Sequence, residues 1–198
     1  MVVVQAMEAL GNEFILIDAI SQKIDSEEEL KLLKTCAEEF SFDQLLFLKP
    51  PTQKHAHLKL KIYNVDGSLA ENCVNGIRAL ALYAFDESLV FSNTFILQIE
   101  DNLAQITRLQ ENEFAVKMSS FKFTKSSCAI ADSQELQFNF EGTDIKFYPV
   151  SVGNPHAVIF QDSLSDQIPE MGLTLQKSNI YKNGVNVGFV KILNEKEI

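Results

Sequence analysis

The chain has 198 residues, of which 46% are hydrophobic, and this is enough to bury one large hydrophobic core or two small ones. Its 17 basic and 27 acidic residues give a net charge of −10, which would repel nucleic-acid phosphates and an anionic membrane surface. The longest uninterrupted apolar run, residues 79–85, is far shorter than the roughly 18 residues of a membrane-spanning helix, and no basic segment precedes the first valines, so we expect a globular protein of the cytoplasm.

The first segments of the chain show the patterns of strands and a helix. Residues 1–18 predict two short strands joined by a tight turn at Gly11-Asn12. Residues 25–40 carry apolar side chains at every third or fourth position, which predicts an amphipathic helix with Ser26 and Glu29 as its capping box. Residues 57–63 alternate between apolar and polar side chains and therefore predict a half-buried strand.

The next segments predict a helix enclosed by a sheet. Residues 75–85 are apolar on nearly all sides and rich in Ala and Leu, which is typical of a helix that is buried on most of its surface. Three strand-like runs follow at residues 94–99, 103–109 and 113–118, separated by polar turns, and these predict a meander. We therefore expect an α/β fold whose first domain, residues 1–118, is a sheet wrapped round the central helix 75–85.

The second half of the chain predicts another α/β domain, residues 119–198. After a polar crossing at residues 122–127, strand-like runs occupy residues 136–140, 144–150, 157–160 and 187–193. No long apolar helix accompanies these strands. We therefore expect the second domain to lack a central helix and to expose an apolar face, which would bind a partner chain, associate with itself or leave the domain loosely packed.

The cysteines suggest one reactive thiol. Cys36, Cys73 and Cys128 are far apart and form no C-x-x-C pair, so neither a disulfide framework nor a metal site is indicated. Cys73 directly precedes the predicted buried helix, where unpaired backbone N–H groups and the helix dipole favour a thiolate. The plainer interpretation of such a cysteine is a small buried hydrophobic residue. We predict that Cys73 reacts faster than Cys36, which lies on an apolar helical stripe, and Cys128, which no motif surrounds.

The residues around Cys73 resemble the first cysteine motif of the diaminopimelate epimerase family, N-x-D-G-S-x-x-x-x-C-G-N-G-x-R. Here residues 64–78 read N-V-D-G-S-L-A-E-N-C-V-N-G-I-R. Four further segments are similar to that family in the expected order: A-L-G-N-E-F at 9–14, F-D-Q-L-L at 42–46, S-V-G-N-P-H at 151–156 and N-V-G-F-V at 186–190. The resemblance spans nearly the whole chain and implies two pseudo-symmetric domains, each a sheet round a central helix, with the second domain incomplete here.

The resemblance also implies a chemistry. Enzymes of this family interconvert LL- and meso-2,6-diaminopimelate, a precursor of lysine and peptidoglycan, without a cofactor or a metal. They use two cysteines, because inversion of a stereocentre by proton exchange needs a base on one face and an acid on the other. Cys73 corresponds to one of these cysteines, and His156 to a residue close to the catalytic centre. The positions that correspond to substrate-binding residues are Asn12, Gln44, Asn64, Val74, Asn75, Asn154 and Asn186.

Several of these residues also have a structural interpretation. Asparagines beside Gly or Pro, such as Asn12 and Asn154, commonly form turns through bonds from the side chain to the backbone. Gln44 fits a solvated loop residue, and His156, between a proline and an apolar strand, fits a hydrogen-bonded structural histidine. The sequence alone leaves both interpretations open.

The sequence departs from the family pattern at two places. Val74 replaces a family glycine, and a β-branched side chain there would hinder close approach of the substrate's carboxylate. The family's E-R-G-x-G-E-T motif and its second cysteine motif, A-C-G-x-G, do not occur in residues 1–198. We therefore expect a C-terminally truncated member that is inactive alone or depends on a missing C-terminal part. A second copy or a complementing C-terminal chain is the expected protein partner.

Two other functions remain compatible with the sequence. The first is a non-catalytic relative that binds or senses amino acids through the same asparagines. The second is an isomerase similar to the phenazine-biosynthesis type, which shares the two-domain architecture but works with carboxylates instead of thiols. This second alternative has less support, because Cys73 and Asn64 match the thiol family.

Overall fold

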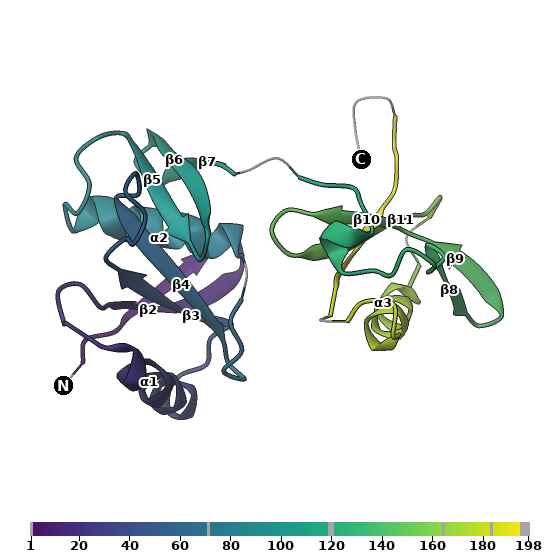
Figure 1. Ribbon diagram of the computed structural model, residues 1–198, viewed down its shortest axis with the longest axis horizontal. Coiled ribbons are helices and arrows are strands. Elements are labelled where there is room, and N and C mark those ends of the chain that lie inside the picture. The colour runs from purple at the N-terminus through teal and green to yellow at the C-terminus, as the bar shows by residue number, and fades with distance from the viewer. Residues whose placement is uncertain (1, 71, 119–120, 164, 183, 195–198) are drawn as a thin grey trace. The chain divides into compact units, whose positions relative to one another are not determined.

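A computed structural model describes residues 2–70, 72–118, 121–163, 165–182 and 184–194 (Figure 1). The chain divides into two units, residues 1–119 and residues 120–198. Both units mix strands with helices, and the α/β fold predicted from the sequence is confirmed. None of the helices in the described ranges is long and apolar enough to cross a membrane.

Unit 1 contains a seven-stranded sheet in which the strand order follows the chain. The strands are β1 (Gln5–Ala9), β2 (Asn12–Asp18), β3 (Gln44–Lys49), β4 (Leu58–Asn64), β5 (Thr94–Ile99), β6 (Asn102–Gln110) and β7 (Glu113–Lys117). The pairs β2–β3 and β4–β5 are parallel, with α1 (Ser26–Glu39) and α2 (Val74–Asp86) as their crossover helices, and the other neighbours are antiparallel. Helix α2 packs against both edge strands, β1 and β7, so the sheet curls round it.

Each face of the central strands of unit 1 meets a helix. Leu16 of β2 and Leu46 of β3 pack in a core with α2, whereas Ile17 and Phe47 pack in a second core with α1. Because successive strand residues point to opposite faces, a strand buried on both faces reads as a continuous apolar run. The predicted central helix is confirmed by its burial, since the side chains of Ile77, Leu80 and Ala84 are completely buried.

Unit 2 is built from short strands and one helix. Strands β10 (Tyr148–Ser151), β11 (Pro155–Phe160) and β12 (Asn186–Val190) form a three-stranded sheet, and β8 (Gln137–Phe140) pairs with β9 (Thr143–Lys146). The one-turn helix η1 (Ser126–Cys128) precedes them. Helix α3 (Ile168–Lys177) lies between β11 and β12 in the chain and buries Met171 and Leu175 in the core of this unit.

The structure differs from the local predictions at four places. The N-cap of α1 is Asp25 and its capping-box partner is Glu28, one residue before the predicted pair. Strand β3 and helix α3 were not predicted. The run expected as one strand at 144–150 is divided at the buried Phe147, because β9 pairs with β8 and β10 pairs with β11 in a separate sheet.

A β-β-α-β arrangement occurs in both units. In unit 1 it consists of β1, β2, α1 and β3, and in unit 2 of β10, β11, α3 and β12, with antiparallel and parallel pairings in the same order. When Gly11-Asn12 is aligned with Gly153-Asn154, Phe14 corresponds to His156. Phe14 lies opposite Gln44 in the first pair of parallel strands, and His156 lies opposite Asn186 in the second. The expected pseudo-symmetry therefore extends to the register of the parallel pairs.

The two copies of this arrangement differ on the face opposite the crossover helix. In unit 1, α2 covers this face. In the described part of unit 2 no helix does so: Tyr148 and Phe160 are 53% and 49% exposed, and their rings pack edge to face with centroids 5.4 Å apart. We call this face of the three-stranded sheet, with Tyr148 and Phe160, the open face of unit 2. Ile192 and Leu193, which follow β12, are also exposed.

Candidate functional site

Cys73 is the N-cap of α2, and its sulfur faces the first turn of that helix. Its Sγ accepts a hydrogen bond from the backbone N–H of Gly76 at 3.4 Å. Burial raises the pKa of the Cys73 thiol, and the Asp43 carboxylate raises it further, whereas the N–H groups of Gly76 and Asn75 act in the opposite direction. The expected effect of the helix N-terminus is present, but burial outweighs it.

A glycine brings the start of α2 close to the sheet. A Cβ atom added to Gly76 would lie 3.2 Å from Cδ2 of Leu46 and 3.4 Å from the ring of Phe14, both of which are buried. The first distance is tighter than ordinary van der Waals contact, so a larger residue would require the neighbouring side chain or α2 to shift by a few tenths of an ångström. Gly76 therefore suits the close approach of α2 to β2 and β3.

Two of the predicted amides, Asn12 and Asn75, form a hydrogen-bonded pair at the start of α2. Asn75, in the first turn of α2, donates from Nδ2 to Oδ1 of Asn12 at 2.9 Å. Asn12 in turn donates from Nδ2 to Oδ2 of Asp43 at 3.1 Å, and the same carboxylate oxygen accepts the backbone N–H of Glu13 at 2.9 Å. On the other side, Nη1 of Arg78 donates to Oδ1 of Asn75 at 3.4 Å.

The second predicted amide pair bridges β3 and β4. Gln44 lies opposite Asn64 in the antiparallel register, and its Nε2 donates to Oδ1 of Asn64 at 3.0 Å. Asn64 donates from Nδ2 to Oγ of Ser68 at 3.0 Å, and the Ser68 hydroxyl donates to Oδ1 of Asp66 at 2.6 Å. The structural interpretation of Gln44 as a solvated loop residue is wrong, because it is the partly buried first residue of β3.

Three predicted residues of unit 2 gather at the start of β11 and β12. Nε2 of His156 lies 3.0 Å from Oδ1 of Asn154, and Nδ2 of Asn186 donates to the carbonyl of Pro155 at 3.4 Å. Burial lowers the pKa of His156, so its imidazole is neutral near pH 7. Tyr181 donates from its hydroxyl to the His156 carbonyl at 3.4 Å and thereby ties this strand to the segment after α3.

The other cysteines and possible metal ligands do not join these groups. Cys36 is buried in the core under α1, as its place on an apolar stripe predicted. Cys128 is also buried, at 2% exposure, although the sequence placed it in a polar crossing. Among the described residues, no group of three His, Cys, Asp or Glu side chains is arranged to hold a metal ion. Val74, the remaining predicted residue, is the first residue of α2 and is half-buried.

The structure adds residues that the sequence analysis did not select. Asp43, Ser68 and Arg78 bond directly to predicted amides, and Asp66 accepts the hydroxyl hydrogen bond of Ser68. All four lie inside the motifs quoted above, and their position beside a predicted amide was the available indication. An ionised side chain next to a polar one is common on any surface, so sequence alone gave no reason to prefer them.

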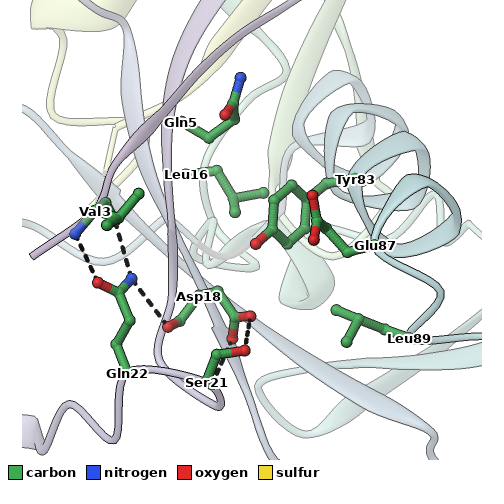
Figure 2. Close-up of a pocket in the computed structure, with 9 residues that line it drawn as sticks. All are labelled: Val3, Gln5, Leu16, Asp18, Ser21, Gln22, Tyr83, Glu87 and Leu89. Atoms are coloured by element: carbon green, nitrogen blue, oxygen red, sulfur yellow. Dashed lines mark hydrogen bonds between the residues drawn. The ribbon is translucent and has the colours of Figure 1, made fainter.

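A cavity of about 390 Å³ lies at the other end of α2 and contains none of the predicted residues (Figure 2). Three of its polar residues, Asp18, Ser21 and Gln22, bond to the protein itself. The Asp18 carboxylate accepts the backbone N–H groups of Ile20 and Ser21 and the Ser21 hydroxyl. The side-chain amide of Gln22 accepts the backbone N–H of Val3 and donates to its carbonyl. These bonds hold the first residues of the chain against the loop after β2.

Sequence comparison connects this arrangement with known proteins. The family model for diaminopimelate epimerase matches residues 4–124. The diaminopimelate epimerase of Psychrobacter cryohalolentis is 30% identical over 200 residues, which cover 97% of this chain and 68% of that protein. The diaminopimelate epimerase of Teredinibacter turnerae is 29% identical over 198 residues, which cover 97% of this chain and 71% of that protein.

Solved structures with a similar fold share little sequence with the chain. A probable proline racemase from Agrobacterium radiobacter K84 superposes with a TM-score of 0.69 at 11% identity and covers all of this chain and 68% of its own. A hydroxyproline epimerase from Agrobacterium vitis gives 0.66 at 9% identity, over 87% of this chain and 58% of its own. A phenazine biosynthesis protein of the PhzF family from Bacillus anthracis gives 0.53 at 14%, over 98% and 67%. At these identities the likeness shows a shared fold alone.

Proposed function

The chain belongs to the diaminopimelate epimerase family, and from this premise we propose that it binds 2,6-diaminopimelate and supplies Cys73 as one of the two proton-transferring groups of a cofactor-independent epimerisation. The observation that carries the proposal is the position of the Cys73 sulfur at the N-terminus of α2, beside the linked amides of Asn12 and Asn75. The proposal places the protein in the biosynthesis of lysine and peptidoglycan precursors in the cytoplasm.

Each group near Cys73 has a role in this chemistry. The thiolate of Cys73 removes the α-proton of the substrate, and the thiol returns a proton to the same face in the reverse direction. Backbone N–H groups at the start of α2 favour a negatively charged ligand, so they suit the α-carboxylate and the charge that develops on it. Asn12, Gln44, Asn64, Val74 and Asn75 form the substrate-binding set in unit 1.

Unit 2 contributes a second set in the same proposal. Asn154 and Asn186 bind the substrate's polar groups, and neutral His156 corresponds to a family residue close to the catalytic centre. Supporting this assignment, His156 and Asn186 occupy the same paired register positions as Phe14 and Gln44 in unit 1. A neutral imidazole accepts or donates a hydrogen bond without bringing a further charge to the substrate.

We propose that the chain cannot complete the inversion by itself. Inversion requires an acid on the face opposite Cys73, and the other two thiols of residues 1–198, Cys36 and Cys128, are buried in the separate cores under α1 and in unit 2. A complementing C-terminal chain, or a second copy, would have to supply this acid. The open face of unit 2 supports the proposal, because it offers an apolar surface to such a partner.

The purified 198-residue chain is therefore expected to bind diaminopimelate but to epimerise it poorly. Loss of a positioned acid or base costs about 10²- to 10⁴-fold in rate. We would measure binding of the LL and meso isomers by calorimetry, and conversion of LL to meso in D₂O with α-deuteration followed by NMR. Deuteration without inversion is the expected result, and Cys73→Ser should abolish the deuteration while leaving binding intact. Failure of both isomers to bind at millimolar concentration would overturn the proposal, and rapid inversion would show that another group replaces the second thiol.

A non-catalytic amino-acid-binding role is the second candidate, and one observation favours it. Burial raises the pKa of Cys73, which keeps the thiol protonated near neutral pH. In this case the chain binds diaminopimelate but no α-deuteration occurs, even at a pH high enough to ionise the thiol. Val74→Gly provides a further comparison: if Val74 obstructs the carboxylate, the variant binds diaminopimelate more tightly than the unmodified chain does.

A further inference from the structure

The Asn12–Asn75 pair belongs to a hydrogen-bond chain with a single direction. Arg78 donates to Asn75, Asn75 donates to Asn12, and Asn12 donates to the Asp43 carboxylate. A guanidinium can only donate and an ionised carboxylate can only accept, so the two ends of the chain impose the same direction. In this direction each amide uses its carbonyl towards Arg78 and an N–H towards Asp43.

The Gln44–Asn64 pair belongs to a second chain with the same property. Gln44 donates to Asn64, Asn64 donates to the Ser68 hydroxyl, and that hydroxyl donates to the Asp66 carboxylate. A hydroxyl can reverse its direction, but a carboxylate at the end of the chain prevents it from doing so. Asp66 also accepts the backbone N–H of Ser68 at 2.9 Å, which holds it in place.

A terminal carboxylate has a large effect on an amide because the two ends of an amide have nearly the same shape and opposite hydrogen-bonding character. If the Asn12 amide turned over, its carbonyl would face the Asp43 carboxylate and its NH₂ would face the NH₂ of Asn75. Two hydrogen bonds would be replaced by two repulsive contacts. The same holds for Asn64 between Gln44 and Ser68. The orientation of each amide decides whether a ligand meets a donor or an acceptor there.

We propose that Asp43 and Asp66 are positioning residues that fix the amide orientations of the Asn12–Asn75 pair and the Gln44–Asn64 pair. They thereby determine which amide atoms meet the carboxylate and ammonium groups of the substrate. The part that concerns the substrate rests on the proposed function, whereas the fixed orientation itself does not. Hydrogen bonds from Asn12 and from Ser68 hold the pKa values of Asp43 and Asp66 below their usual range, so both carboxylates are ionised at neutral pH.

The orientation can be tested by NMR on the side-chain NH₂ groups of the ligand-free chain. In the unmodified chain, one proton of the Asn12, Asn75 and Asn64 side-chain amides should exchange with solvent more slowly than its geminal partner, because it is hydrogen bonded. Asp43→Ala should accelerate this exchange about tenfold at Asn12 and Asn75 and leave Asn64 unchanged. Asp66→Ala should do the reverse. Asp43→Asn retains an acceptor oxygen and should restore slow exchange at Asn12.

Each outcome of this test decides the inference. Equal exchange of both protons at Asn12 and Asn64 in the unmodified chain overturns it without any variant, as does Asp43→Ala if it leaves Asn12 and Asn75 unchanged. A general loss of structure would accelerate exchange in both amide pairs together and would also contradict selective positioning.

Calorimetry with diaminopimelate then tests the part of the inference that concerns the substrate. Asp43→Ala should weaken binding about 3- to 10-fold, and Asp43→Asn should restore it. If the unmodified chain does not bind diaminopimelate, the proposed function fails while the NMR result still decides the orientation.

Discussion

At the residue scale, the Cys73 thiol is subject to two opposing effects. Burial raises its pKa, while the N–H groups at the start of α2 lower it. The Cys73 side chain is nevertheless only half-buried, whereas Cys36 and Cys128 are 3% and 2% exposed. Reactivity of the native thiols is therefore controlled by access to the sulfur more than by its acidity.

Cys73 is expected to be the first thiol that limiting iodoacetamide modifies in the native chain, since the reagent cannot reach a buried sulfur without local unfolding. Peptide mapping after short exposures at several pH values would measure this. The rate at Cys73 should continue to rise with pH above about 8.5, the ordinary pKa of a cysteine thiol, because its own pKa is raised. The matched control is Cys73→Ser, which should remain unlabelled until denaturant is added. Earlier modification of Cys36 or Cys128 would contradict the assignment.

The residues of the candidate site could be selected from the sequence, but not the contacts between them. Asn75 bonds to Asn12 across 63 positions of the chain, and Asn12 to Asp43 across 31. Such contacts depend on the curvature of the sheet and on the depth of α2, to which local patterns are insensitive. The dependence of the Cys73 pKa on burial could not be predicted for the same reason.

At the scale of elements, α1 is attached to the sheet by a buried charge. Glu29 is completely buried and bonds to the ammonium groups of Lys49 and Lys61, the latter at 2.7 Å, and to the Tyr63 hydroxyl at 2.9 Å. Burial alone would raise the pKa of Glu29, but the hydrogen bonds from Lys49, Lys61 and Tyr63 together lower it. A carboxyl whose pKa is lowered on folding stabilises the folded state at neutral pH, and this stabilisation disappears as the pH falls through the folded pKa.

Glu29→Gln is accordingly expected to lower the free energy of unfolding by about 3 kcal/mol at pH 7, because it leaves two partly buried ammonium groups without their carboxylate. The difference should begin to diminish as the pH falls below about 4.3, the ordinary pKa of a glutamate, and should vanish only below the lowered pKa of folded Glu29. Urea unfolding at pH 7 and along a series of lower pH values measures it. Glu38→Gln, on the exposed side of the same helix, is the matched control and should change stability by less than about 0.5 kcal/mol. Equal effects of the two substitutions would show that the buried ion pairs do not stabilise α1.

Local patterns predicted the elements whose burial is visible in their own sequence. Strand β4 alternates as expected, with Leu58, Leu60 and Ile62 buried, and α2 is apolar on all sides because a sheet encloses it. Strand β3 shows no alternation, since residues 45–48 are buried on both faces between α1 and α2. Helix α3 is short, has no side-chain N-cap and contains Gly172, so its stability depends on packing within unit 2.

At the scale of the whole molecule, the open face of unit 2 predicts a difference in stability between the units. Helix α3 covers one face of the three-stranded sheet, which the sequence did not predict, but Tyr148 and Phe160 remain half exposed on the other. A sheet buried on one face alone opens more easily than one enclosed on both.

Hydrogen exchange on a verified monomer should therefore be faster in residues 144–193 than in residues 75–118, by about tenfold or more for the slowest amides. The exchange rates of amides in β11 and β12, compared with those in β2 and β3 at the same register positions, give a matched comparison within one chain. If the amides of β11 and β12 are protected as strongly as those of β2 and β3, unit 2 is closed by contacts other than those described above. Slower exchange at higher protein concentration would indicate that copies cover this face for one another.

The strand order of unit 1 also has a consequence for synthesis on the ribosome. Because the strands are ordered β1 to β7 along both the chain and the sheet, each strand can add to the edge left by the strand that emerged before it. No strand has to wait for a distant partner, and sequence-local pairing of this kind speeds folding. Until β7 has emerged, however, the growing sheet has not closed round α2, which packs against that strand in the complete unit. The nascent chain is thus most vulnerable to misassembly between the completion of α2 and the closure of β7 against that helix.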